Sequence, residues 1–167
     1  EILKSYNPER IVAYHPFGRT SSSLWFHNEP WLDMNLFQSG HRRYDQASLG
    51  EWDDNAERET FFGEDNWKYV DRDLSYDIVK PTLDAEPSYE GLHNPRNPYW
   101  EEWDVRRYAY WSVFAGAAGH TYGSNAIMQF YDDFNERGAY GVRELWQDAM
   151  HHPGCAQLGY LKNLMES

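Results

Sequence analysis

The sequence has very little cysteine, few basic residues and no long apolar run. Its single cysteine, Cys155, excludes an internal disulfide framework. It has 15 lysines and arginines against 27 aspartates and glutamates, and this net charge of −12 argues against nucleic acid or an anionic membrane surface as a partner. No apolar stretch approaches the roughly 20 residues of a membrane-spanning helix. We therefore expect a neutral ligand.

Several signatures of catalysis are also missing. There is no glycine-rich phosphate loop and no Gly-x-Ser-x-Gly nucleophile elbow, so phosphoryl transfer and serine hydrolysis lose their main support. Of the seven histidines only His151 and His152 are adjacent, and no His-Glu-x-x-His pattern occurs. The sequence therefore predicts neither a metal site nor a cofactor.

Aromatic residues, in contrast, are abundant. Eight tryptophans and thirteen tyrosines exceed what a small core needs, and they are typical of a cleft that stacks on sugars. The 167 residues suffice for one domain but fall short of the roughly 250 residues of a complete eight-stranded α/β barrel. We interpret residues 1–167 as a single domain.

The strongest chemical signal lies in residues 80–91. The β-branched, apolar run 78–83 predicts a short buried strand, which Pro87 ends. Asp84 and Glu86 alternate with apolar residues, so both carboxylates should lie on one side of the chain where the strand stops. Catalytic groups collect at such strand ends in parallel α/β folds. The alternative is that these carboxylates cap the next helix or form a structural ion pair.

Three further apolar runs, 11–14, 31–37 and 119–123, also end in polar residues. Hairpin signals between the runs are missing, so the four runs predict βα repeats with a parallel sheet. We expect a set of sugar-binding side chains beside Glu86 on the functional face of this sheet. They are His15, Gln38, His41, Tyr89, His120 and Tyr122.

Helical spacing of apolar residues predicts helices over 67–75, 101–118, 141–150 and 156–165. The aromatic stripe of the second helix is interpreted as core; it contains Trp103, Tyr110, Trp111 and Phe114. Residues 1–10 are interpreted as an incoming loop, and residues 42–66 as a long loop or lid with at most one short helix.

These groups suit hydrolysis of a glycosidic bond. In that reaction one carboxylate attacks or stabilises the anomeric carbon and a second carboxylic acid protonates the leaving oxygen. Glu86 is the best candidate for the nucleophile. The second carboxylate stays open: Glu90, Asp33 and Asp84 are candidates, and no motif supports any of them.

Several ordered motifs together resemble the apiosidase-like glycoside hydrolases. They are His15-Pro16-Phe17-Gly18, Trp31 to Asn35 running into Gln38-Ser39-Gly40-His41, Lys80 to Glu90, Arg106 to Gly116, Gly119-His120-Thr121-Tyr122-Gly123 and Pro153 to Gln157. The resemblance implies a (β/α)₈ TIM barrel and a retaining glycosidase with an acid/base after strand four and a glutamate nucleophile after strand seven. The four runs resemble strands five to eight of that barrel, and Glu86 falls on the nucleophile position.

The resemblance leaves the acid/base and the first half of the barrel outside this sequence, and it favours a secreted or periplasmic bacterial enzyme. One hypothesis is a glycoside hydrolase, represented by its C-terminal half, that cleaves O-glycosidic bonds in plant-type polysaccharides or oligosaccharides. The alternative is a non-catalytic carbohydrate-binding half barrel. A sheet cut from a closed barrel has two unpaired edges, so we expect a homodimer. The competing outcome is a monomer in which residues 42–66 and the N-terminal residues cover the open face.

Overall fold

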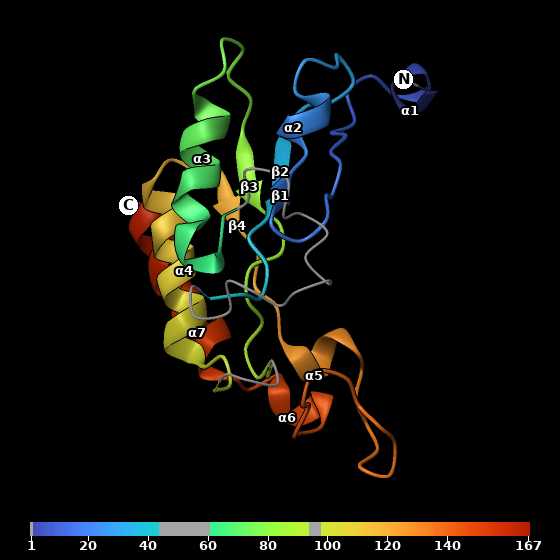
Figure 1. Ribbon diagram of the computed structural model, residues 1–167, viewed down its shortest axis with the longest axis vertical. Coiled ribbons are helices and arrows are strands. Elements are labelled where there is room, and N and C mark those ends of the chain that lie inside the picture. Colours follow the sequence, from blue (N-terminus) through green and yellow to red (C-terminus); the bar gives the residue numbers. More distant parts are fainter. Residues whose placement is uncertain (1, 44–60, 94–97) are drawn as a thin grey trace.

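A four-stranded sheet forms the centre of the computed structural model, which describes residues 2–43, 61–93 and 98–167 (Figure 1). The strand order is β1-β2-β3-β4. The strands are β1 (Thr20–Ser21), β2 (Asn35–Gln38), β3 (Thr82–Asp84) and β4 (Gly119–His120). Strands β2, β3 and β4 are parallel, whereas β1 runs antiparallel to β2. The antiparallel strand was not expected from the sequence.

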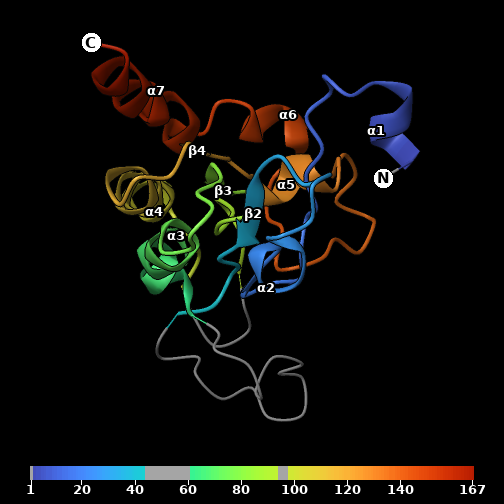
Figure 2. The same ribbon diagram turned by 90° about the horizontal axis from the view of Figure 1, so that it is seen from above.

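Three long helices alternate with the parallel strands. They are α3 (Asn66–Leu74) after β2, α4 (Glu102–Phe114) after β3 and α7 (Pro153–Met165) after β4. Seen from above, all three lie on one side of the sheet, with α2 and α5 on the other (Figure 2). This alternation confirms the predicted α/β fold, which corresponds to part of a TIM barrel.

The remaining helical elements are short. They are α1 (Ile2–Tyr6), α2 (Ser23–Phe26), the 3₁₀ helix η3 (Gly63–Asp65), α5 (Asn125–Met128) and α6 (Trp146–Ala149). None of the helices in the described part of the chain is long and apolar enough to cross a membrane.

The sheet and the long helices pack through two apolar clusters and a buried carboxylate. One cluster contains Phe37, Tyr69, Val70 and Ala117, and the other Leu92, Trp100 and Tyr108. Asp73 of α3 is fully buried and accepts hydrogen bonds from three hydroxyl groups. The donors are Ser21 at 3.1 Å, Ser23 at 2.5 Å and Thr82 at 2.7 Å. These bonds satisfy the buried charge and tie α3 to β1 and β3.

None of the four predicted strands forms over its full length: the strand over 11–14 is absent, and β2, β3 and β4 cover only parts of 31–37, 78–83 and 119–123. Residues 11–14 form no strand, and Ile11 is 75% exposed. Val12 accepts a backbone hydrogen bond from Asp33, but its own N–H donates to the Asp33 carboxylate instead of to a main-chain carbonyl. Ile78 and Val79 precede β3 and are also exposed. An apolar run forms a strand only where a neighbouring strand completes its hydrogen bonds. The strand predicted over 11–14 was therefore wrong, and the one predicted over 78–83 is confirmed only from Thr82 onward.

Helix α4 was predicted correctly, but its buried face was not. The side chains on the buried face are Asp104, Val105, Tyr108, Ala109 and Ser112. Trp103, Trp111 and Phe114 of the aromatic stripe are 45%, 37% and 61% exposed. The Arg107 guanidinium lies 4.4 Å from the Trp103 ring centre and 4.9 Å from that of Trp111. Stacking on arginine lets these indoles lie along the surface.

The other helix predictions had mixed outcomes. Helices α3 and α7 confirm the predictions over 67–75 and 156–165, whereas only residues 146–149 of the predicted helix 141–150 are helical. Residues 1–10 contain α1 instead of only a loop. Of the predicted loop 42–66, residues 44–60 lie outside the described residues, and residues 63–65 form η3.

Candidate active site

Glu86 lies two residues beyond the end of β3, beside the loop that follows β2. The register pairs Phe37 with Asp84, so the chain leaves both strands at the same edge of the sheet. The Gly40 N–H donates to the Glu86 carbonyl at 3.0 Å, and Gly40 has a φ of +77°, which favours glycine. This bond fixes the two loops to each other and places His41 beside Glu86.

Each oxygen of the Glu86 carboxylate faces an imidazole. His41 Nε2 lies 3.2 Å from Oε1, and His15 Nε2 lies 3.5 Å from Oε2. Tyr89 hydrogen-bonds the same carboxylate. Its ring meets the His41 ring edge-on, with 4.5 Å between ring centres. Three of the predicted site residues therefore surround Glu86.

This environment keeps Glu86 ionised. The hydrogen bond from His41 is the main cause that lowers the pKa of Glu86, against the opposing effect of burial, and the charges of His41 and His15 act in the same direction as the bond. Burial and the neighbouring Glu86 charge raise the pKa of Tyr89, so its phenol keeps the proton that it donates. An ionised carboxylate at a strand end is the form that a nucleophile requires.

The other predicted sugar-binding residues make different contacts. His120 Nδ1 lies 2.9 Å from the Ser112 hydroxyl of α4, and burial lowers the pKa of His120 to about 3. The Tyr122 hydroxyl donates to Glu90 at 2.8 Å. Gln38 ends β2, and its side-chain amide lies against Gly18. His120 Nδ1 also lies 4.0 Å from the Asp84 carboxylate of β3, so the described side-chain contacts of His120 and Tyr122 are with Ser112, Asp84 and Glu90, not with Glu86.

The three candidates for a second carboxylate each have partners of their own. Asp33 forms an ion pair with Lys4 at 2.6 Å. Asp84 is fully buried and accepts a hydrogen bond from the Ser39 hydroxyl at 2.7 Å. Burial raises the pKa of Asp84 to about 7. These contacts stabilise the N-terminal segment and the β2–β3 connection.

The side chain of Glu90, the third candidate, lies against the first turn of α7. It is 3% exposed and accepts a hydrogen bond from the Gly154 N–H at 3.3 Å, in addition to the bond from Tyr122. Burial raises the pKa of Glu90. A carboxylate at this position satisfies a backbone donor in the first turn of a helix.

Two residues that support the site were absent from the sequence-based candidates. Gly40 positions His41, and the available signal was a glycine directly after a predicted strand. Asn66, at the start of α3, donates to the Tyr108 carbonyl at 2.7 Å and lies 3.4 Å from Asp84. No local sequence pattern indicates this long-range contact. Within the described ranges, no group of three or more His, Cys, Asp and Glu side chains is placed to hold a metal ion.

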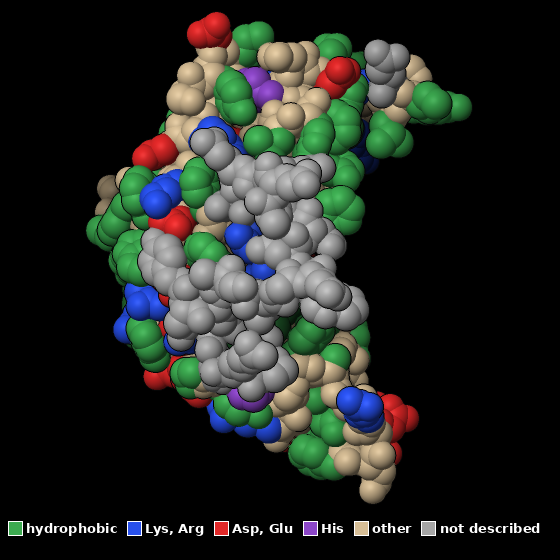
Figure 3. All heavy atoms as spheres, viewed as in Figure 1, with side chains coloured by type: hydrophobic (Ala, Val, Ile, Leu, Met, Phe, Trp, Pro, Cys, Tyr) green, Lys and Arg blue, Asp and Glu red, His purple; other side chains and the backbone are tan. Residues whose placement is uncertain are grey.

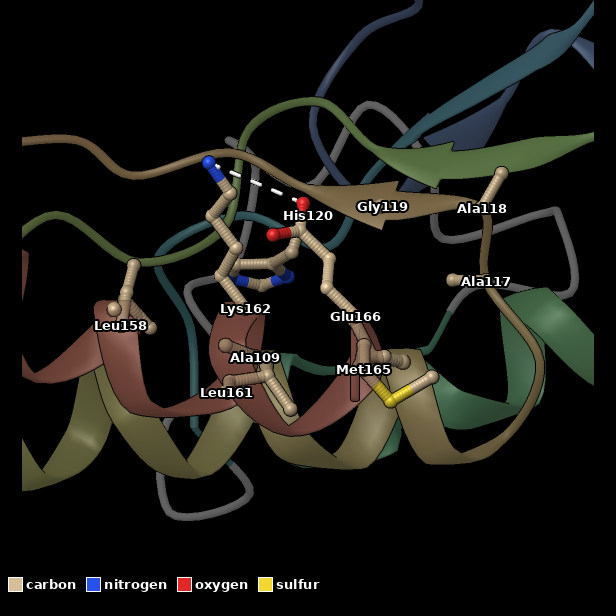
Figure 4. Close-up of a pocket in the computed structure, with 12 residues that line it drawn as sticks. Ala109, Ala117, Ala118, Gly119, His120, Leu158, Leu161, Lys162, Met165 and Glu166 are labelled. Atoms are coloured by element: carbon tan, nitrogen blue, oxygen red, sulfur yellow. Dashed lines mark ion pairs between the residues drawn. The ribbon is translucent and has the colours of Figure 1, made fainter.

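A cavity of about 550 Å³ lies elsewhere, between α4, β4 and α7 (Figure 4). Small and apolar side chains such as Ala109, Leu158 and Leu161 form most of its lining. Lys162 and Glu166 point from α7 toward β4 and form an ion pair of 3.9 Å. His120 lines the cavity, but the residues that contact Glu86 do not. The cavity is therefore distinct from the carboxylate site.

Comparison with known proteins identifies the family of this chain. Residues 1–167 match the sequence model of the apiosidase-like catalytic domain. The chain belongs to this family. Comparison with the curated proteins gives no significant match.

Two solved structures extend the apiosidase-like assignment. A glycoside hydrolase is 48% identical with a TM-score of 0.87, and the match covers 98% of this chain and 37% of that one. A glycoside hydrolase family 5 protein from Bacteroides vulgatus ATCC 8482 is 44% identical with a TM-score of 0.83, covering 98% of this chain and 35% of that one. The apiosidase-like chain thus spans about a third of the length of these two proteins.

Proposed function

We propose that this apiosidase-like chain contributes the nucleophile half of a retaining glycoside hydrolase active site, with Glu86 as the nucleophile. Its substrates are plant-type polysaccharides or oligosaccharides with O-glycosidic bonds. The observation that carries the proposal is the Glu86 carboxylate at the end of β3, with each oxygen facing a histidine. We further propose that residues 1–167 form one domain, equivalent to the C-terminal half of a TIM barrel.

The geometry suits a double-displacement reaction. A Glu86 oxygen forms a bond to the anomeric carbon while the bond to the leaving oxygen breaks, and a carboxylic acid protonates that oxygen. Water then hydrolyses the glycosyl ester and regenerates Glu86. The hydrogen bond from His41 holds the carboxylate in its ionised form, and Tyr89 fixes its orientation.

The acid/base is proposed to come from outside these 167 residues. Asp33, Asp84 and Glu90 are each engaged by partners of their own, and none of these bonds is to the Glu86 carboxylate. The two solved relatives extend well beyond the matched segment, and the family resemblance locates the acid/base after strand four. Substrates with a highly activated leaving group need little protonation, so they can react with Glu86 without that acid.

Turnover of dinitrophenyl glycosides tests the proposal. Glu86→Gln is isosteric and should lower kcat by a factor of about 10³ or more, which is the scale for loss of a nucleophile. Glu166→Gln, at an exposed position on the last turn of α7, is the matched control and should retain wild-type turnover. Wild-type turnover that survives Glu86→Gln would contradict the assignment. Saccharide binding without any turnover would support the second candidate, a non-catalytic carbohydrate-binding half barrel.

A further inference from the structure

Two exposed aromatic residues in the loop between α5 and α6 have strained backbone conformations. Phe130 has a φ of +47° and is 69% exposed, and Tyr140 has a φ of +53° and is 61% exposed. This left-handed region costs a residue with a β-carbon about 1 kcal/mol or more. The Phe130 ring meets the Trp146 ring edge-on, with 6.0 Å between ring centres, but side chains this exposed recover little of that cost through burial. Strain of this kind indicates that the positions serve another purpose.

The surrounding hydrogen bonds hold both residues in place. The Gln129 side chain accepts a hydrogen bond from the Ala139 N–H at 2.8 Å and donates to the Ala139 carbonyl at 3.2 Å. Because Gln129 precedes Phe130 and Ala139 precedes Tyr140, these bonds bring the two arms of the loop together. The Tyr140 carbonyl also accepts bonds from the His93 N–H at 3.0 Å and the Asn125 side chain at 2.9 Å.

The loop is linked to the Glu86 site through the segment that follows β4. Asn125, which binds the Tyr140 carbonyl, also donates its own N–H to the Glu90 carbonyl at 2.9 Å. Two residues earlier, Gly123 packs so closely on the Tyr89 ring that an added β-carbon would overlap it. Tyr89 in turn hydrogen-bonds Glu86. The aromatic loop is therefore connected to the proposed nucleophile through contacts between neighbouring residues.

The views of the molecule agree with this connection. The segment that follows β3 runs toward the end where α5 and α6 lie (Figure 1). In the space-filling view the α5–α6 loop projects from that end, with hydrophobic side chains next to charged ones (Figure 3). Phe134 on the same loop is 64% exposed. An exposed aromatic surface beside charged groups suits a ligand with both apolar faces and hydroxyl rims.

We propose that Phe130 and Tyr140 form an aromatic subsite that stacks on sugar units of the substrate distant from the scissile bond. This inference rests on the proposed glycoside hydrolase function and adds that the substrate is a polymer or long oligosaccharide instead of a simple glycoside. The strain is kept because it holds both rings exposed on a loop that is linked to Glu86 by the contacts described above. The net charge of −12 favours neutral chains, such as xylan or mannan, over acidic ones.

Glycine substitutions separate this role from a structural one. Glycine adopts positive φ without strain, so Phe130→Gly and Tyr140→Gly should each leave the Tm unchanged or raise it by a few degrees. The same changes should weaken binding of long xylan or mannan oligosaccharides up to about tenfold, because a stacking ring is lost. Tyr160→Ala, which removes an exposed ring from α7, is the control and should bind as wild type does.

Isothermal titration calorimetry with oligosaccharides of increasing length, all in the Glu86→Gln background, gives the answer. The proposal expects affinity to rise with length and the glycine variants to lose that rise. Wild-type affinity in both variants, an equal loss at every length, or a lowered Tm would overturn it, as would a protein ligand on these rings that excludes saccharide. Failure of the proposed function would appear separately, as absent turnover in the parent chain, because these binding measurements need no turnover.

Discussion

The hydrogen bond between His41 and Glu86 is the contact that most directly sets the charge of the candidate nucleophile. It lowers the pKa of Glu86, so the folded protein keeps this carboxylate ionised at lower pH than an ordinary glutamate. Activity that needs the ionised form should therefore persist into moderately acidic solution and fall as the pH drops through the lowered pKa. Losing the bond should raise the pKa of Glu86, so that activity begins to fall at a higher pH.

His41→Phe tests that relation because it keeps a ring against Tyr89 while removing the hydrogen bond. We expect kcat/KM for an activated aryl glycoside to begin falling at a higher pH than in the wild type, because the carboxylate is protonated sooner as the pH drops. The pH profile of kcat/KM is the measurement. His151→Phe, at an exposed position, controls for loss of a histidine. An unchanged acidic limb in His41→Phe would show that this bond does not set the charge of Glu86.

At the scale of a secondary-structure element, the start of α7 depends on a glycine. A β-carbon at Gly154 would overlap the Glu90 carboxylate and lie 2.7 Å from Val105 Cγ2. Glu90 and Val105 are 3% and 2% exposed, so neither has room to move. Gly154→Ala should destabilise the fold by about 1–3 kcal/mol, the usual cost of overpacking.

Gly159 supplies the matched control in the same helix. A β-carbon at Gly159 would have no neighbour within 4 Å. Gly159→Ala should therefore be neutral or stabilising by up to about 1 kcal/mol, because alanine is the better helix former. Urea unfolding of both variants measures the difference. Equal stabilities of the two variants would contradict the assignment of Glu90 as the partner of the α7 terminus.

Local periodicity was enough to predict the long helices but not the strands or the directions of side chains. The spacing of Trp67, Val70 and Leu74 predicted α3 almost to the residue. The strand predicted over 11–14 is absent because strand formation depends on a distant partner strand, which no local pattern specifies. The buried face of α4 was predicted wrongly because Arg107 stacks on two exposed indoles. Hydrophobicity alone therefore assigned these indoles to the core.

The candidate site shows the same limit. The strand-end rule correctly placed His41 beside Glu86, since they follow β2 and β3 at one edge of the sheet. His15 also lies against Glu86, although the run 11–14 before it forms no strand. The rule could not separate Glu86 from Asp84, two residues earlier, which is fully buried beside Ser39. Alternation along a strand predicts only the face on which a side chain lies. Asp84 is still within β3 and is buried, whereas Glu86 lies beyond the end of the strand and is partly exposed.

At the scale of the whole molecule, the sheet ends in two short edge strands. β1 and β4 are terminal in the strand order, and α7 exposes Leu164 and Met165. Unpaired edges and exposed apolar side chains favour association with another chain. We propose that two copies pair, which would also allow a partner carboxylate to approach Glu86 as the missing acid.

Light scattering over a concentration series at moderate salt measures this association. We expect a mass near twice the 19.8 kDa of one chain. The net charge of −12 opposes pairing, so the dimer should weaken when the salt concentration is lowered. A mass that stays at 19.8 kDa at every concentration would exclude the dimer, and with it an acid supplied by a second copy of the chain.

The central claim is that Glu86 forms a bond to the sugar, and covalent trapping tests it most directly. Activated 2-fluoro glycosides of plant-type sugars, apiose among them, slow hydrolysis of the glycosyl ester and need little help from an acid. Intact-mass and peptide mass spectrometry should then show one added fluoroglycosyl group per chain, located on Glu86 and absent from Glu86→Gln. A label on Asp84, Glu90 or another residue, a label that persists in Glu86→Gln, or saccharide binding without any label would contradict the claim.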